Sequence, residues 1–191
     1  DVFRSLGATV EEVDLGWGSE VLQAGMVYLN HIFGGSVAAL LDEHADKMSS
    51  YTRHFGETGK TSKSADFVHS LEVAGKMYAT LGPILEKYDV LICPTTALPA
   101  VPADYDQSNG EIRINDKLVH PSLGWVMTTP FNTMSRCPVL SVPSGFARNG
   151  VPTGIQIVGR TYCDEDVFRA GMAYETALGG WFGDKSARPK L

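Results

Sequence analysis

The side chains that could do chemistry in this chain are scattered, and no complete catalytic set is visible among them. Ser36 follows two glycines, as some nucleophiles do, but it lies within a helical pattern and precedes the apolar run VAALL. A position on a helix surface or at a packing contact is the preferred interpretation. Ser62-Lys63-Ser64 sets a lysine between two serines. Adjacent side chains do not face each other, so a solvated loop is favoured there. Neither stretch is a G-x-S-x-G elbow.

The positions of the histidines and cysteines in the sequence also favour structural roles over catalytic ones. His44, His54, His69 and His120 have neither the His-x-Glu spacing nor the paired-His spacing of a metal site. Cys93 precedes Pro94 at the exit of one predicted strand, and Cys137 precedes Pro138 at the entrance of another, and a small buried thiol is the usual occupant of such positions. With Cys163 the cysteines number three and are far apart, which favours reduced thiols in a cytoplasmic protein. We expect no metal and no cofactor.

Composition excludes some classes of partner. The chain has 191 residues and a formal charge of -6, with 43% hydrophobic and 20% charged residues, as in ordinary globular proteins. It has no concentrated basic stripe, so direct binding of nucleic acid is not expected. It also has no run of about 18 apolar residues, so no membrane span is expected.

The first half of the chain reads as mainly helical. A helix end is predicted before Gly7, and a helix that starts at residue 1 without a cap suggests a piece of a longer protein. A short strand is predicted over 8–15, a polar loop over 54–64, and a second helix from Ser64 that Gly82-Pro83 should kink or break. Between the predicted strand and the predicted loop, a long helical region should bury one apolar face, made of Leu22, Met26, Leu29, Phe33, Val37, Leu40 and Met48.

The second half alternates buried strands with turns. Residues 90–93 form an apolar run typical of a strand buried on both faces, and 112–114 with 117–119 suggest a small hairpin through Asn115-Asp116. Residues 139–142 and 155–158 read as buried strands joined through Asn149-Gly150. A last helix is predicted from Asp164, its expected N-cap, to Leu178. Helices alternating with buried strands indicate the α/β class.

Several ordered motifs then carry a family resemblance. The runs YDVLICPTTALPAVP, TTPFN, PVLSVPSG, GVPTGIQIVGR and DEDVFRAGMAYE together resemble the C-terminal half of amidase signature enzymes. The resemblance implies a mixed β-sheet core flanked by helices, with 1–191 as the C-terminal part of a single amidase domain. It also implies amide hydrolysis through a Ser-Ser-Lys triad and an acyl-enzyme. Those catalytic residues belong to a lysine-bearing segment and a GGSSGG-like segment that are not in this sequence.

The resemblance also implies where this chain would meet a substrate. The side of the pocket opposite the triad would be lined by Thr95, Thr96, Trp125, Met127, Thr128 and Asn132; for the threonines and the TTPFN loop, hydrogen bonds that fix the loops are the alternative. Expected partners are a small-molecule amide and the remainder of the amidase chain, with a homo-oligomer as a further option. The chain alone is expected to be inactive.

Two departures from the family pattern bear on this expectation. The family commonly has Asn-x-x-Gly-x-Pro, whereas Asn132 here leads through TMSRC to Pro138, one residue longer and without the glycine. In the related A-type components of tRNA-dependent amidotransferases an acidic residue precedes the T-x-P-x-N threonine by three positions, and here that position is Trp125. An amidase for apolar or aromatic amides is therefore favoured. The alternatives are a non-catalytic binding or scaffold fragment and the A-type component of a glutamine-dependent tRNA amidotransferase.

Overall fold

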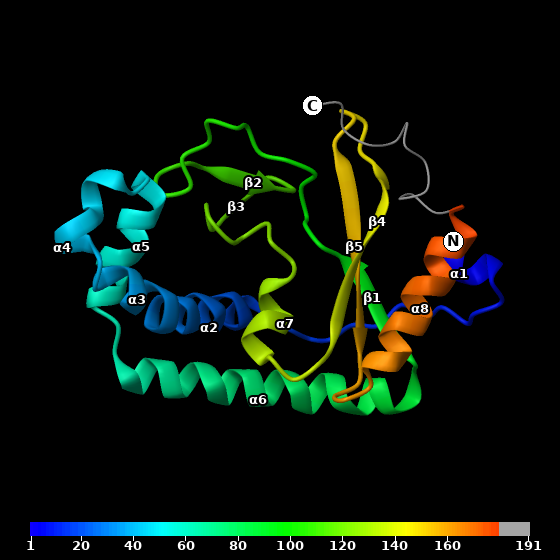
Figure 1. Cartoon of the computed structure of the whole chain (residues 1–191). Coiled ribbons are helices and arrows are strands. Elements are labelled where there is room, and N and C mark those ends of the chain that lie inside the picture. Colours follow the sequence, from blue (N-terminus) through cyan, green and yellow to red (C-terminus); the bar gives the residue numbers. More distant parts are fainter. Residues whose placement is uncertain (180–191) are drawn as a thin grey trace. The chain divides into compact units, whose positions relative to one another are not determined.

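The computed structural model describes residues 1–179, drawn in colour in Figure 1. The chain divides into two compact units. The first unit combines Asp1–Leu15, Leu81–Thr95 and the described residues from Arg136 to Gly179. The second combines Gly16–Thr80 with Thr96–Ser135. The α/β class predicted from the sequence is confirmed, because helices accompany antiparallel sheets in this fold.

The first unit is built on a three-stranded antiparallel sheet with the order β1-β5-β4. The strands are β1 (Val90–Pro94), β4 (Val139–Phe146) and β5 (Pro152–Gly159). All three were predicted, but β4 and β5 are each longer than the apolar runs that indicated them. β5 lies in the centre, and its Gln156, Ile157 and Val158 are completely buried. β1 lies at one edge and is only half-buried, so the expected burial of both its faces is wrong.

Helix α8 (Asp164–Ala177) packs against this sheet through glycine. A Cβ on Gly171 would lie 2.4 Å from Cδ2 of Leu140 in β4, so the helix can approach the strand only because that side chain is absent. Val167 and Tyr174 share the buried face, and the Tyr174 ring stacks on Phe3 of α1 (Val2–Ser5) at 5.3 Å. Cys163, not the predicted Asp164, occupies the N-cap position, and its side chain makes no capping hydrogen bond.

The strand predicted over residues 8–15 is wrong. These residues follow the αL glycine Gly7, as expected, but they join no β-ladder. They are tied instead by side chains: Arg4 donates to the carbonyl of Val10, and the Tyr88 hydroxyl donates to the Glu11 carboxylate. Apolar alternation fixes which side chains would share a face, whereas a strand also needs a neighbouring backbone to pair with.

The second unit is mostly helical and carries one small hairpin. Asn115 and Asp116 have φ values of 50° and 62°, which is the left-handed geometry of a tight two-residue turn, so the predicted hairpin is confirmed. The elements of this unit are α2 (Ser19–Leu29), the π-helical turn η1 (Asn30–Gly34), α3 (Gly35–Ala38), α4 (Leu41–His44), the 3₁₀ turn η2 (Ala45–Lys47), α5 (Ser50–Lys60), the first part of α6 (Ser64–Lys87), β2 (Ile112–Ile114), β3 (Lys117–Val119) and α7 (Thr129–Met134).

The long helical region after residue 18 does not keep one buried face. Val37 is buried as predicted, but Phe33 is 58% exposed and Leu40 is 48% exposed, while the neighbouring Leu41 is buried. The π-helical turn η1 explains this difference, because its wider turn rotates all later residues relative to a regular 3.6-residue pattern.

The loop predicted over 54–64 is wrong for most of its length, because α5 continues to Lys60. The two glycines that suggested a loop are packing contacts. A Cβ on Gly56 would lie 2.9 Å from Cδ1 of Leu41, and one on Gly59 would lie 2.1 Å from the carbonyl carbon of Gly34. These glycines therefore serve close helix approach, and they do not end the helix.

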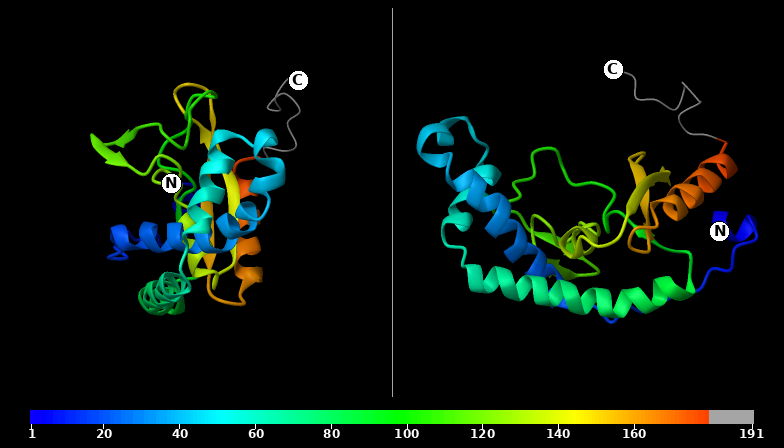
Figure 2. Two further views of the ribbon diagram at one scale, coloured as in Figure 1. Left: turned by 90° about the vertical axis from the view of Figure 1, so that its left-hand side faces the viewer. Right: turned by 60° about the horizontal axis from the view of Figure 1, so that its bottom comes forward.

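Helix α6 begins at Ser64 as predicted, but Gly82-Pro83 does not break it. Figure 2 shows α6 as one continuous helix in its right-hand view. Leu81 and Leu85 flank the proline and are buried, at 0% and 4% exposure. Their burial offsets the cost of about 3 kcal/mol that an interior proline imposes on a helix.

Among the described residues, no individual helix has the length and apolar character needed to cross a membrane. The bent pair Ser19–Ala38 and Leu41–Lys47 meets that test only when its members are taken together.

Candidate functional site

The candidate pocket residues of the second unit lie on two chain segments that are joined through their backbones. Thr96 forms an isolated antiparallel bridge with Val126. The N–H of Ala97 donates to the carbonyl of Trp125 at 2.9 Å. The bridge therefore places Thr96 beside the segment that carries Trp125 and Met127, although thirty residues of chain separate them.

Helix α7 fixes the next two candidates. Thr128 is its N-cap residue, Pro130 stands in its first turn, where a missing N–H costs nothing, and the N–H of Asn132 donates to the Thr128 carbonyl at 3.1 Å. Asn132 is exposed, whereas Thr129, Phe131, Thr133 and Met134 are buried. The exposed amide of Asn132 is thus the polar group that α7 offers to a ligand or solvent.

The buried side of α7 is packed tightly against α2. A Cβ on Gly25 would lie 2.8 Å from Cγ2 of Thr129 and 3.0 Å from Oγ1 of Thr133. The Thr133 hydroxyl donates to the Thr129 carbonyl at 2.9 Å, so this buried polar group is satisfied within the helix. Trp17 covers the end of the contact, with its ring 5.8 Å from that of Phe131. Rigid packing of this kind holds the Thr128–Asn132 turn in place.

Two indole N–H groups stand out in this unit. Nε1 of Trp17 and Nε1 of Trp125 are both buried, and neither has a hydrogen-bond acceptor among residues 1–179. A buried donor without an acceptor costs roughly 1–3 kcal/mol, so each is a place where a ligand oxygen or a water would be stabilising. The sequence pointed to Trp125 but gave no signal for Trp17.

Thr95 belongs to the first unit and has a different environment. Its hydroxyl donates to the carbonyl of Gly154 at 3.0 Å, and its N–H donates to the same oxygen at 3.1 Å. A Cβ on Gly154 would lie 3.1 Å from Oγ1 of Thr95. Both contacts tie the end of β1 to β5, as the alternative of a loop-fixing hydrogen bond predicts for this threonine.

The TMSRC departure from the family pattern has a defined geometry. Ser135 ends α7 in the left-handed conformation, with a φ of 50°, at the third position after Asn132. That is the position where the resembling family has its glycine, and left-handed backbone is where glycine is most favourable. Directly after it, the carbonyl of Arg136 accepts a hydrogen bond from the Thr161 hydroxyl at 2.7 Å.

The two serine sites that the sequence raised have different surroundings. The Ser36 hydroxyl is exposed and donates to the carbonyl of Ile32, as on an ordinary helix surface. Ser62, expected to be solvated, is half-buried, and its Oγ lies 2.9 Å from Nδ1 of His31. The His31 ring in turn stacks on Phe67 at 4.4 Å. This pair was missed because the two residues are far apart in the sequence.

The thiols in the described part of the chain do not form a reactive centre. Burial raises the pKa of the Cys93 thiol to about 11, although a hydrogen bond with Gln156 acts in the opposite direction. Burial also raises the pKa of Cys137, against a smaller lowering by Thr161. Within residues 1–179 no three acidic, histidine or cysteine side chains are grouped so that they could hold a metal ion.

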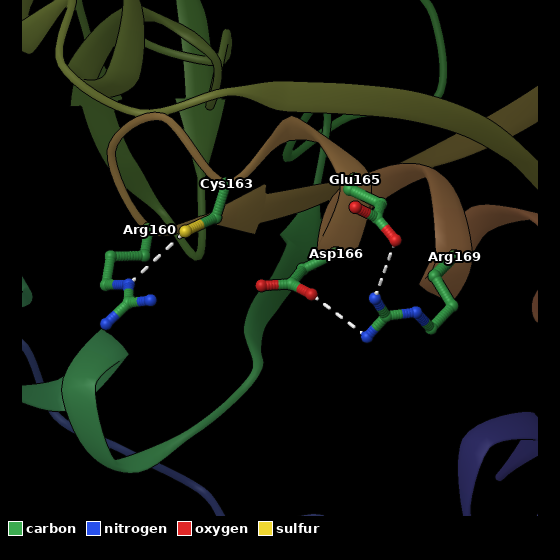
Figure 3. Close-up of polar contacts among 5 residues, drawn as sticks. All are labelled: Arg160, Cys163, Glu165, Asp166 and Arg169. Atoms are coloured by element: carbon green, nitrogen blue, oxygen red, sulfur yellow. Dashed lines mark hydrogen bonds and ion pairs between the residues drawn. The ribbon is translucent and has the colours of Figure 1, made fainter.

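Cys163 lies among charged side chains at the start of α8, drawn in Figure 3. Nε of Arg160 donates to its sulfur at 3.4 Å, and Arg169 pairs with Glu165 at 3.1 Å and with Asp166 at 3.0 Å. Acidic side chains in the first turn of a helix interact favourably with the helix dipole. Because Glu165 and Asp166 precede Arg169 by four and three residues, one arginine can reach both carboxylates. These exposed contacts stabilise the helix start modestly.

A family model described as Amidase matches residues 6–168 of this chain. The chain belongs to the amidase family. It is 28% identical over 203 aligned residues to the A component of the glutamyl-tRNA(Gln) amidotransferase of Oceanobacillus iheyensis, and the match covers 92% of this chain and 39% of that protein. It is 23% identical to an amidase of Pseudomonas putida, covering 93% of this chain and 37% of that enzyme.

The fold of this amidase-family chain is also found in solved structures. A bacterial aryl acylamidase of the amidase signature family superposes with a TM-score of 0.79 at 26% identity, over 100% of this chain and 41% of that one. The chain thus spans about two-fifths of the length of these relatives. The family resemblance predicted from the five motifs is confirmed.

Proposed function

We propose that this amidase-family chain forms the C-terminal part of a hydrolase that cleaves carboxylic amides bearing apolar or aromatic groups. The reaction is acyl transfer through a Ser-Ser-Lys acyl-enzyme, with the catalytic residues supplied by the rest of the parent chain. Family membership and the likeness to an aryl acylamidase support it. On this proposal the present chain contributes core strands and one wall of the pocket.

The presence of tryptophan at position 125 is the observation that supports an apolar or aromatic amide as the substrate. It stands three positions before Thr128, where the A-type amidotransferase components that this chain resembles have an acidic residue. A carboxylate there would hold the ammonium group of glutamine, whereas an indole offers a flat apolar face on which an aromatic amide can pack. The buried indole N–H, without an acceptor among the described residues, supplies a donor for a substrate oxygen.

The other proposed residues of the pocket wall lie on the two chain segments that the Thr96–Val126 bridge joins. Thr96 lies beside the Trp125–Met127 segment through the Thr96–Val126 bridge. Thr128 is the N-cap residue of α7, and Asn132 lies within that helix. We assign to the pocket wall, with Trp125, the residues Thr96, Met127, Thr128 and Asn132. Met127, at 36% exposure, offers an adaptable apolar contact suited to an aryl or alkyl group. A pocket role for Thr95 stays a prediction.

A second candidate function is that of the A component in a glutamine-dependent tRNA amidotransferase. Its specific support is the similarity to the Oceanobacillus iheyensis protein, which covers 92% of this chain. It predicts glutaminase activity and a protein partner. A non-catalytic fragment that binds a partner is a third, weaker candidate, since it requires the 191-residue chain to fold and act alone.

The test compares two substrates and two variants in the full-length protein. We expect the wild type to hydrolyse an aryl anilide and to leave glutamine intact. W125F keeps an aromatic face and serves as the matched control, while W125D removes that face. We expect W125D to lower kcat/KM for the anilide by about tenfold, or ~1.4 kcal/mol, and W125F to lower it less. Glutamine hydrolysis without anilide hydrolysis, unchanged in W125D, would contradict the proposal.

The location of the nucleophile is tested by mass spectrometry of the 191-residue chain after treatment with a fluorophosphonate probe. An unchanged mass agrees with a nucleophile outside this chain. One stoichiometric adduct on a serine would show that a working nucleophile is within it, and the assignment of the chemistry to the rest of the parent protein would be wrong.

A further inference from the structure

The turn that leads into Trp125 is held by a histidine ring. The N–H groups of Ser122 and Leu123 both donate to Nδ1 of His120, at 3.2 and 3.4 Å. The N–H of Gly124 donates to the His120 carbonyl at 2.8 Å. An imidazole nitrogen accepts hydrogen bonds only when it is unprotonated, so this arrangement requires the neutral ring with its proton on Nε2.

The backbone of this turn is closely packed against itself. A Cβ on Gly124 would lie 2.5 Å from the His120 backbone nitrogen, so the chain crosses itself closely at that point. Val126 then donates to the Leu123 carbonyl at 3.1 Å and pairs with Thr96. The direction in which Trp125 leaves the turn is therefore set between His120 on one side and the Thr96–Val126 bridge on the other.

We propose that neutral His120 is a positioning residue for the Trp125–Thr128 segment, and that protonation of its ring loosens this segment. The charged ring carries an N–H on both nitrogens. Its Nδ1–H would point at the N–H groups of Ser122 and Leu123, so two attractive contacts become repulsive at once. The segment then loses the two hydrogen bonds to the ring and keeps the bridge to Thr96.

The groups around His120 make this change local and place it below the usual histidine pKa. Burial, and after it the charge of His54 on α5, lower the pKa of His120 below its usual value. Tyr105 donates to the Pro121 carbonyl at 3.2 Å, and Ser122 donates through its hydroxyl to the Gln107 carbonyl at 2.9 Å.

The nearby carboxylate of Asp106 accepts hydrogen bonds from Ser108, Asn109 and Ser50. The charged side chain of Lys117 on β3 is exposed to solvent. The contacts of Tyr105 and Ser122 with the turn do not involve the ring, so they persist when it is charged.

The sign of the pH effect follows from that lowered pKa. The unfolded chain takes up its proton first as the pH falls through about 6.5. The stabilisation by neutral His120 is therefore complete above that value and is lost as the pH falls through the lower pKa of the folded state.

The test uses the full-length protein labelled with 5-fluorotryptophan, with the ¹⁹F resonance of Trp125 assigned from its absence in W125F. We expect this resonance to move or broaden between pH 8 and pH 5 with a one-proton midpoint. In H120N the amide oxygen replaces Nδ1 as an acceptor that does not titrate, so the resonance should keep its pH 8 position throughout. In H120A it should have the low-pH position at every pH.

Two further variants make the outcome specific. H54N removes the neighbouring charge and should raise the midpoint, while H69N, on the exposed face of α6, should leave it unchanged. A wild-type titration that persists in H120N would overturn the proposal, as would an H120A resonance at the wild-type pH 8 position. The consequence for amide hydrolysis rests on the proposed function, but the ¹⁹F result does not, so the two can fail separately.

Discussion

Gly59 of α5 lies so close to Gly34 that a Cβ added to Gly59 would sit 2.1 Å from the Gly34 carbonyl carbon. In the other direction, a Cβ on Gly34 would lie 2.9 Å from the carbonyl oxygen of Phe55 and 3.1 Å from Cα of Gly59. Backbone faces backbone at this crossing, and no flexible side chain can move aside. The pair therefore sets the distance between α5 and the π-helical turn η1.

The first prediction concerns this crossing. We expect G59A to destabilise the protein by about 2–3 kcal/mol, because the methyl group forces the two backbones apart. The measurement is the free energy of unfolding from urea denaturation followed by circular dichroism. G75A is the matched control: it is also a helical glycine, but nothing lies within 4 Å of its added Cβ. It should stabilise by ~0.5–1 kcal/mol, as helix propensity alone predicts. Equal effects of the two substitutions would rule out the packing argument.

The same glycines explain where sequence reasoning was wrong. Gly56 and Gly59 suggested a loop because glycine punctuates loops more often than it serves packing, and their partners Leu41 and Gly34 lie on other elements. Similarly, the π-helical turn at Asn30–Gly34 exchanged the expected burial of Leu40 for that of Leu41. By contrast, the hairpin at Asn115-Asp116 and the strands β4 and β5 depend on local turn chemistry and apolar runs, and all three were predicted as elements. The expected burial was correct for the later part of β5 but wrong for β4, whose residues are half-buried or exposed.

The second prediction concerns Ser135, which stands in the left-handed conformation with a φ of 50° and an exposed side chain. We expect S135G to stabilise the protein by about 0.5–1 kcal/mol, because glycine adopts this backbone without the penalty of a Cβ. S36G is the control, since Ser36 lies in regular helix, where glycine should destabilise by a similar amount. Thermal unfolding of both variants checks the prediction. If S135G lowers the stability as S36G does, the strained-turn interpretation is wrong.

The candidate site was predictable only in part, for a physical reason. Trp125, Met127, Thr128 and Asn132 are near one another in sequence, so a family motif could mark them together. The bridge that brings Thr96 to Val126, and the ring of His120 that holds the turn before Trp125, depend on long-range geometry and on the orientation of an imidazole. No spacing in the sequence encodes either of them.

The third prediction concerns Cys93, whose thiol pKa burial raises to about 11. At pH 8 only about one thiol in a thousand is then the reactive thiolate, against roughly a quarter for an unperturbed cysteine. We expect N-ethylmaleimide at pH 8 to label Cys163 within minutes and Cys93 only when denaturant is present. Peptide mass spectrometry measures both sites in one sample, and Cys137, whose pKa burial also raises, should react slowly.

The same shift in Cys93 predicts how stability changes with pH. The neutral thiol is favoured in the folded state, so its contribution is complete below the unfolded pKa of about 8.5. It is lost as the pH rises from there through about 11, because the unfolded chain releases its proton first. C93A removes this titration, so between pH 8.5 and pH 10 its stability should fall less steeply than that of the wild type. Parallel curves, or labelling of Cys93 as rapid as that of Cys163, would show that the thiol is not buried in the folded protein.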